Sequence, residues 1–373
     1  MASRKVQIFS DSLQPAFRAQ LLEWYDEHAR DLPWRQRPRA TKHGDPYRVW
    51  LSEIMLQQTR VAAVLAHYHE FLRRFPTAEK LARAREASVL AAWSGLGYYR
   101  RARMLHAAAK VVVRERAGMF PETAEGWLEL PGVGRYTAAA IASIAFGEPV
   151  AVVDGNVERV LQRISGRQLA GEEFWLAAER LIDRERPGDF NQAMMELGAT
   201  VCTPRAPACL TCPVVELCAT RGEVASAAKT QRQKKREIHY ALDCRDGAVF
   251  LVRRAQDARL MAGMWELPEL DGPSGADEIA SLKAPRHPKT RRVASAEPCF
   301  TLKHSITVTN YAVRVWRMPA PPSVNGKWIP VEKLARLALT GLARKILRKA
   351  DLLASDILAA DIIASIRSGS GVI

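Results

Sequence analysis

Up to about Thr220, apolar residues recur at every third or fourth position, with breaks at proline or glycine. This pattern predicts helices over residues 17–28, 48–75, 88–93 and 100–117, with Pro76 and Gly118 as stops. Alternation of β-branched and polar residues is rare in this half. The pattern therefore predicts an all-α domain, which we place at residues 13–220.

The pattern changes after this point. Residues 221–236 hold six basic residues and one acidic residue, a composition typical of a linker. From His239 onward the period is two, and strands are predicted near 239–243, 249–252, 299–302, 306–316 and 327–330. A smaller α+β domain is expected at 237–349. Apolar pairs between Ala350 and Ile366 predict a helix in a C-terminal tail, residues 350–373, without indicating a function.

Composition narrows the class of protein. The chain has 373 residues, 48% of them hydrophobic and 25% charged, which excludes a disordered chain and a small disulfide-stapled scaffold. No apolar run has the length of a secretory signal core or of a membrane span, so a cytoplasmic protein is expected. The net charge of +15 indicates a polyanionic partner and leaves RNA, DNA and acidic membranes open, although excess arginine also serves solubility.

Four of the six cysteines lie close together in the sequence. Cys202, Cys209, Cys212 and Cys218 form a C-x6-C-x2-C-x5-C array. In a reducing compartment such an array indicates a metal site, and four thiolates suit zinc or an iron–sulfur cluster. Zinc sites usually have two close cysteine pairs, whereas this array has one, so the spacing favours iron–sulfur. Cys244 and Cys299 are expected to be small buried hydrophobic residues.

A second motif, LPGVGRYTA, covers residues 130–138 between two helical segments. Pro131 ends the first helix, and Gly132 and Gly134 permit a tight hairpin whose N–H groups face outward. The next helix starts at once, and its positive N-terminus adds to the site. Such a hairpin can hold a phosphate without reading base sequence.

Two carboxylates stand in unlike settings. Glu53 shares a helical face with Trp50, Ile54 and Gln57, so burial should raise its pKa and suit it to act as a general acid. The alternative is a buried, satisfied glutamate. Asp154 precedes a helix that starts near Val157, where it could simply be an N-cap. One helix and a return loop separate it from the hairpin, however, so the two can meet in space.

Together these motifs resemble the endonuclease III superfamily of helix–hairpin–helix DNA glycosylases. The SEIMLQQT helix, the LPGVG hairpin, the VDGNV aspartate and the cysteine array follow the family's order over residues 20–220. LPWR at 32–35, GLGYYRRA at 95–102 and the C-terminal extension resemble adenine DNA glycosylases of the MutY kind. The resemblance implies a [4Fe-4S] cluster on the four cysteines. It also implies excision of adenine opposite 8-oxoguanine or guanine in double-stranded DNA, by a monomer associated with the nucleoid.

The resemblance also implies roles for single residues. Glu53 is expected to act as general acid and then as base, Asp154 to stabilise the sugar cation, and Tyr136 and Asn156 to support them. Because the bond is hidden in the duplex, adenine must be flipped out. The implied adenine pocket consists of Arg30, Leu32, Trp34 and Gln192, and the implied DNA contacts are Gln58, Tyr98, Gly132 and Gly134.

One position separates the candidate reactions. Relatives that also cut the strand carry a lysine just after the hairpin, whose amine forms a Schiff base with the sugar. This chain has Tyr136 there, so a monofunctional glycosylase is expected. The alternatives are an endonuclease III-like glycosylase and lyase on oxidised pyrimidines, and a catalytically silent iron–sulfur DNA-binding protein. Tyr136 disfavours the first, and the presence of both Glu53 and Asp154 disfavours the second.

The C-terminal domain resembles a Nudix fold, with GMWELP at 263–268 as its loop. No REx2EE-like run follows Pro268, so no pyrophosphatase activity is expected. In the resembling family this domain reads 8-oxoguanine through a Phe-Ser-His loop, and the matching place here is Leu302-Lys303-His304. His304 fits that pattern, and Ser305 is the residue that would replace the missing serine.

Overall fold

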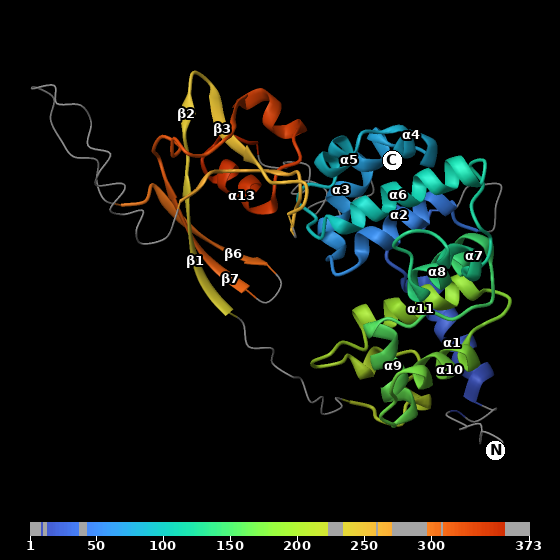
Figure 1. Cartoon of the computed structure of the whole chain (residues 1–373). Helices are drawn as coiled ribbons and strands as arrows, with labels where there is room; N and C mark the ends of the chain where they lie inside the picture. The colour runs from blue at the N-terminus through green and yellow to red at the C-terminus, as the bar shows by residue number, and fades with distance from the viewer. Residues whose placement is uncertain are drawn as a thin grey trace, which may run out of the picture. The chain divides into compact units, whose positions relative to one another are not determined.

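The computed structural model describes residues 9, 13–36, 43–222, 234–258, 260–270, 297–306 and 309–354 (Figure 1). By its contacts the chain divides into two compact units. The first unit is Met1–Arg83 with Met104–Ala227, and the second is Ala84–Arg103 with Ala228–Ile373. A short segment from inside the helical part of the sequence therefore belongs to the second unit.

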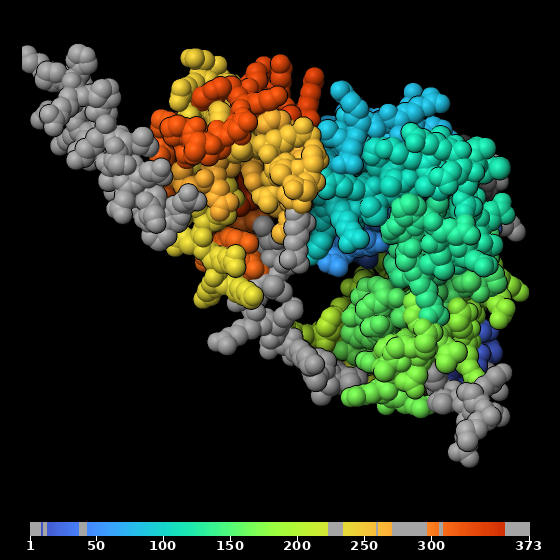
Figure 2. Space-filling view, in the orientation of Figure 1, coloured from blue at the N-terminus to red at the C-terminus, as the bar shows by residue number. Residues whose placement is uncertain are grey.

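Every element among the described residues of the first unit is helical, as predicted. Its elements are α1 (Leu13–His28), α2 (Pro46–Leu56), α3 (Val61–Arg74), α4 (Ala78–Arg83), most of α6 (Arg100–Glu115), α7 (Ala124–Leu128), α8 (Arg135–Ile141), the π-helical turn η1 (Ala142–Phe146), α9 (Gly155–Ser165), α10 (Glu172–Leu181), α11 (Pro187–Thr200), η2 (Cys209–Thr211) and η3 (Val215–Leu217). The helices from α6 to α9, cyan to green in Figure 2, form a continuous packed surface. Within the described residues, no helix is long and apolar enough to cross a lipid bilayer.

The helix predicted over 48–75 is two helices, α2 and α3, so that prediction was wrong. The chain breaks at Gln58, whose φ of 53° is left-handed. Tertiary contact stabilises the break, because Gln57 Nε2 donates to Thr137 Oγ1 of α8 at 3.1 Å. The segment contains neither proline nor glycine, so nothing in the local sequence marked the interruption.

α11 lies at the centre of the first unit and contacts α1, α9 and η1. Almost every side chain from Pro187 to Gly198 is buried. A Cβ on Gly198 would lie 2.6 Å from Cβ of Asn156, so only glycine lets α11 approach the start of α9 this closely. This approach places the first turn of α9 beside the pocket described below.

The second unit is the α+β part of the chain, which confirms the predicted fold class. Its elements are α5 (Glu86–Ala92), β1 (Lys234–Ala241), β2 (Cys244–Arg245), β3 (Ala248–Arg253), β4 (Trp265–Glu266), β5 (Glu269–Leu270), β6 (Phe300–Ile306), β7 (Thr309–Trp316), β8 (Lys327–Pro330), η4 (Val331–Arg336) and α13 (Gly341–Lys349). One sheet has the order β5-β1-β7-β6, with β1 parallel to β7, and the other has the order β2-β3-β4, with β8 paired to β3. The apolar side of α13 packs into the core beside these sheets.

Three details of this unit differ from the sequence-based expectations. The strands predicted over 299–302 and 306–316 are present as β6 and β7 but with another boundary, since β6 continues to Ile306 and β7 begins at Thr309. Strand β1 starts at Lys234, inside the segment predicted as a linker, because residues 234–236 pair with β7. In the predicted tail helix, residues 350–354 form turns rather than helix, and residues 355–373 lie outside the described residues.

Cys244 and Cys299 are exposed, so the prediction that they are buried was wrong. Cys244 lies on β2 and Cys299 immediately precedes β6, and both strands are at sheet edges. Edge positions leave one side of the strand open to solvent, which apolar patterning alone does not reveal.

Candidate active site

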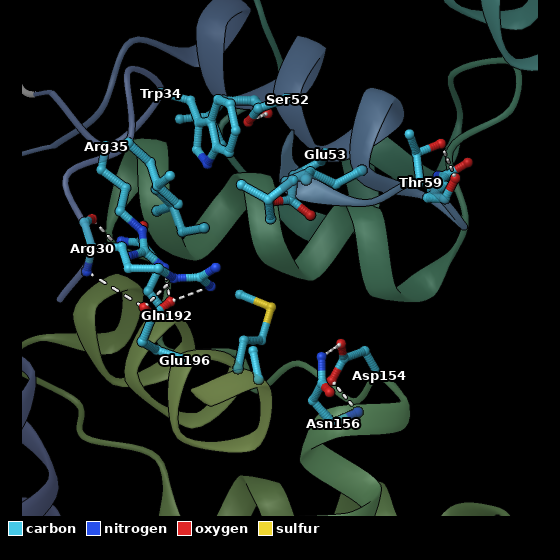
Figure 3. Close-up of a pocket in the computed structure, with 18 of the residues that line it drawn as sticks. Arg30, Trp34, Arg35, Ser52, Glu53, Thr59, Asp154, Asn156, Gln192 and Glu196 are labelled. Atoms are coloured by element: carbon cyan, nitrogen blue, oxygen red, sulfur yellow. Dashed lines mark hydrogen bonds and ion pairs between the residues drawn. The ribbon is translucent and has the colours of Figure 1, made fainter. Parts of the chain in front are cut away.

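A cavity of about 460 Å³ opens in the first unit among α2, α8, α9 and α11 (Figure 3). Its wall includes the predicted residues Arg30, Leu32, Trp34, Glu53, Gln58, Tyr136, Asp154, Asn156 and Gln192. Five separate segments of the chain thus meet here, the four helices and the loop between α1 and α2. The other predicted site residues do not line this cavity: Tyr98, Gly132, Gly134, His304, Ser305 and the four cysteines.

Glu53 projects from α2 and is 6% exposed. Its pKa is raised to about 7, chiefly by burial and also by the charge of Asp154, whereas the hydrogen bond from Tyr136 and the charge of Arg35 oppose the rise. The apolar face of this helix had predicted such a shift. At neutral pH a large fraction of Glu53 therefore carries a proton and can donate it.

Tyr136 holds the Glu53 carboxyl in place from α8. Its hydroxyl lies 2.9 Å from Glu53 Oε2 and 3.1 Å from Met195 Sδ. Burial raises the pKa of Tyr136 well above its ordinary value, and the nearby carboxylates raise it further. The phenol therefore keeps its proton and acts as a hydrogen-bond donor to Glu53.

Asp154 is both an N-cap and a pocket residue. Its Oδ1 accepts from the N–H groups of Asn156 at 2.9 Å and of Val157 at 2.8 Å, while its Oδ2 accepts from Asn156 Nδ2 at 3.0 Å. Three donors and the positive end of α9 therefore face one carboxylate and stabilise its negative charge. Figure 3 shows this carboxylate across the pocket from Glu53.

Arg159 was not predicted as a site residue, yet it orients the side-chain amide of Asn156 beside Asp154. Its Nη2 donates to Asn156 Oδ1 at 2.8 Å, which leaves Asn156 Nδ2 directed to Asp154. Its Nε donates to the carbonyl oxygen of Cys202 at 2.7 Å, and Nη2 also donates to Gly198. Arg159 lies three residues after Asn156 on one helix, which is the signal that could have identified it.

Glu196 was also missed. This carboxylate is 1% exposed and accepts from Arg30 at 2.5 Å and 2.9 Å and from Arg35 at 2.7 Å (Figure 3). Burial raises its pKa, but the two guanidiniums outweigh that effect and hold the pKa below its ordinary value. Because it follows the predicted Gln192 by one helical turn, it shares that residue's face of α11. This part of the pocket wall is therefore an ion-pair network around a buried carboxylate rather than a set of separate polar side chains.

The predicted hairpin joins α7 to α8. Gly132 has φ 78°, and a Cβ there would lie 2.4 Å from Cβ of Met104, so a larger residue does not fit. Gly134 is the N-cap of α8 and, like Gly132, is exposed. The first N–H groups of α8 lack a side-chain cap, which leaves them available to an external acceptor such as a phosphate.

The other predicted DNA contacts are exposed side chains on irregular backbone. Gln58 lies at the break between α2 and α3, and Tyr98 lies in the segment that belongs to the second unit. Arg101 and Arg103, which follow Tyr98 closely in the sequence, are engaged within the protein. Arg103 pairs with Glu86 at 3.0 Å, and Arg101 stacks over Tyr98.

The four clustered cysteines lie in the irregular segment after α11. In the described part of the chain, no group of three or more His, Cys, Asp or Glu side chains is arranged to hold a metal ion. The thiols are nevertheless near one another. Burial raises the pKa of Cys212 to about 11, and the other three thiols add to the rise. Arg163 donates to Cys202 Sγ at 3.3 Å and the N–H of Arg221 to Cys218 Sγ at 3.4 Å, so the sulfurs have the donors that thiolate ligands use.

His304 and Ser305 lie on β6 of the second unit. Burial and the nearby Lys345 lower the pKa of His304, so its ring is neutral at pH 7. Ser305 Oγ donates to Asn310 Oδ1 at 2.6 Å. As consecutive residues of a strand, the two side chains point to opposite faces of the sheet. Leu302 is buried in the core on the side of His304.

Comparison with known proteins identifies the class. A family model described as HhH-GPD superfamily base excision DNA repair protein matches residues 51–172, and a NUDIX domain model matches residues 239–349. The solved structure of a thermostable thymine-DNA glycosylase is 31% identical, covers 57% of this chain and 97% of its own, and aligns with a TM-score of 0.52. The fold and the carboxylate-lined pocket thus define a helix–hairpin–helix DNA glycosylase, a hydrolase of N-glycosyl bonds that acts on DNA.

Relatives narrow this class to a family. Adenine DNA glycosylase of Mus musculus is 36% identical over 413 residues, which cover 91% of this chain and 79% of that protein. The enzyme of Homo sapiens is 52% identical over 218 residues, which cover 56% of this chain and 40% of that protein. The chain therefore spans less than half of the human relative's length. This chain belongs to the adenine DNA glycosylase family.

Proposed function

We propose that this protein removes adenine mispaired with 8-oxoguanine or guanine in duplex DNA, by hydrolysis and without cutting the strand. The observation that carries the proposal is one cavity with two carboxyl groups in opposite environments. Glu53 is buried with its pKa raised to about 7, and Asp154 faces three N–H donors. Acid catalysis at a glycosidic bond uses such a pair.

Glu53 supplies the proton in this mechanism. Adenine leaves poorly as an anion, and a proton delivered to a ring nitrogen lets it leave as a neutral base. Once ionised, the Glu53 carboxylate accepts a proton from the attacking water. Tyr136 holds that carboxylate by its hydroxyl, 2.9 Å from Oε2.

Asp154 acts on the sugar. Loss of the base leaves an oxocarbenium-like ring, whose positive charge an adjacent carboxylate stabilises through space or by a transient covalent bond. The cap hydrogen bonds hold this carboxylate before substrate arrives, so little reorganisation is needed during the reaction.

The monofunctional assignment rests on the composition of the pocket wall. None of the described residues lining the cavity is a lysine, so an amine that could attack the sugar is missing from it. Incubation with an adenine:8-oxoguanine duplex, followed by hot alkali, tests the proposal. We expect strand cleavage only after alkali. Cleavage without alkali would favour a lyase, and binding without any base release would favour a silent DNA-binding protein.

We propose that the second unit recognises the base opposite adenine through His304. The side chain of Ser305 lies on the other face of the same strand. A neutral imidazole can donate one hydrogen bond and accept another, which suits the edge of an oxidised purine. The supporting observation is the lowered pKa of His304, which keeps the ring uncharged.

Tyr136→Phe tests the coupling between the tyrosine and the acid. The hydrogen bond from Tyr136 lowers the pKa of Glu53, so its loss should raise that pKa. We expect the pH above which the single-turnover rate of adenine release falls to move upward by roughly one to two units. The measurement is a pH–rate profile at saturating enzyme. An unchanged profile would contradict the assignment of Tyr136 as a donor to Glu53.

We propose that Cys202, Cys209, Cys212 and Cys218 hold a [4Fe-4S] cluster. When bound, the cluster would cross-link four points of this segment and supply folding free energy there. Purified protein should contain iron and acid-labile sulfide in equal amounts and show a broad visible absorbance. Cys212→Ser should lose both and unfold at lower temperature, whereas Cys244→Ser should change neither. Colourless protein containing zinc would overturn the assignment.

A further inference from the structure

Tyr98 is an exposed aromatic side chain on strained backbone. The residue is 48% exposed, and its φ of 47° lies in the left-handed region that favours glycine. Gly97 before it has φ 71°. A tyrosine keeps this conformation only where its surroundings impose it, and such residues concentrate at functional sites.

The residues on either side of this loop donate to one carbonyl oxygen. Ser94 Oγ lies 2.9 Å from the carbonyl oxygen of Leu339, and Tyr99 Oη lies 3.2 Å from the same atom. Ser94, Tyr99 and Leu339 are all buried. A carbonyl oxygen has two lone pairs, so this one can accept from both hydroxyls. Both ends of the loop that carries Tyr98 are therefore hydrogen-bonded to the same carbonyl oxygen.

This carbonyl group lies between strand β4 and helix α13 of the second unit and is connected to both. Leu339 pairs with Trp265 of β4 in a parallel bridge, and the N–H of Thr340 donates to the carbonyl oxygen of Trp265 at 2.9 Å. Thr340 then caps α13. Arg344 of α13 donates from Nε to Ser94 Oγ at 3.0 Å, so the helix also holds the loop directly.

The ring of Tyr98 is oriented as well. Cζ of Arg101 lies 5.3 Å from the centre of the Tyr98 ring and 5.5 Å from that of Trp93. Trp93 is fully buried, and its Nε1 donates to the carbonyl oxygen of Gly97 at 3.1 Å. The exposed ring thus rests on a guanidinium that is itself packed against the core.

We propose that Ser94, Tyr99 and Leu339 are positioning residues of the second unit. Together they hold Tyr98 ready to stack on a base of the bound duplex. This inference rests on the proposed function, because it requires a DNA substrate. A ring fixed before binding loses little rotational freedom when it stacks, and every base offers it a π-face. The unit that contacts the base opposite adenine would then also set the position of the stacking residue.

The test uses the full chain and a duplex with an adenine:8-oxoguanine mispair flanked by 2-aminopurine, whose fluorescence reports stacking. Tyr98→Ala should weaken binding roughly fivefold to a hundredfold and remove the fluorescence change. The double variant Ser94→Ala, Tyr99→Phe keeps the Tyr98 ring, yet should lose most of the fluorescence change and weaken binding at least about threefold. Ser94→Ala alone removes one donor and should show a smaller loss of fluorescence change and affinity. This single variant replaces the double variant in the test if the double variant does not fold.

Tyr47→Phe is the matched control. Tyr47 is equally buried, and its hydroxyl donates to the carbonyl oxygen of Phe75 at 2.7 Å, but it lies in the first unit and does not line the pocket. It should lose similar thermal stability and keep the wild-type fluorescence change. A folded double variant that matches Tyr47→Phe in fluorescence and affinity would overturn the positioning role. If wild-type protein releases adenine in that case, the proposed function still stands. If wild-type protein releases none, the proposed function fails, and the fluorescence comparison on the same duplex still decides the positioning role.

Discussion

Glu53→Gln is expected to abolish measurable adenine release while mispair binding stays near the wild-type level. Glutamine keeps the size and the hydrogen bond from Tyr136 but cannot donate a proton to the base or accept one from water. Removing a general acid costs on the order of 10³-fold or more in rate. The measurement is single-turnover release from an adenine:8-oxoguanine duplex, with affinity measured separately. A variant that retains full activity would remove Glu53 from the mechanism.

The same substitution should stabilise the protein at high pH. Burial raises the pKa of Glu53 in the folded state from an ordinary value of 4.5 to about 7. The wild-type protein therefore loses stability as pH rises through this window, by roughly 3 kcal/mol at the upper end. A glutamine side chain does not ionise, so the melting temperature of the variant should exceed that of wild type at pH 8 and match it near pH 4. The wild-type rate should fall above about pH 7 for the same reason.

Asp154→Asn is expected to lower the rate of adenine release on the order of 10³-fold with little loss of stability. Asparagine caps a helix about as well as aspartate, so α9 should remain intact. The negative charge that faces the sugar is lost, and with it the stabilisation of the oxocarbenium-like state. Single-turnover rates and thermal melts of the same preparations separate the two effects.

Asp45→Asn is the matched control for this prediction. Asp45 is the N-cap of α2 and accepts from the N–H of Arg48 at 3.0 Å, but it does not line the pocket. Its substitution should leave adenine release unchanged and should alter the melting temperature about as little as Asp154→Asn does. If Asp154→Asn proves no slower than Asp45→Asn, then Asp154 is a helix cap and nothing more.

Sequence alone determined the elements whose cause is local. The helical period, the glycines of the hairpin and the cysteine spacing each reflect backbone or ligand geometry within a few residues. The burial of Glu53 also followed from the sequence, because the apolar residues around it on α2 mark the side of the helix that faces inward. The order of motifs then indicated the family that the relatives show.

Only the tertiary structure decided which distant residues share one environment. The break at Gln58 depends on a contact with Thr137, and the orientation of Asn156 depends on Arg159. Glu196 accepts from an arginine more than 160 residues earlier, which no local pattern predicts. Residues 84–103 likewise group by their contacts with the second unit, in which Ser94 and Tyr99 donate to the carbonyl oxygen of Leu339. Such contacts depend on how whole elements pack, and packing is a property of the complete fold rather than of any window of the sequence.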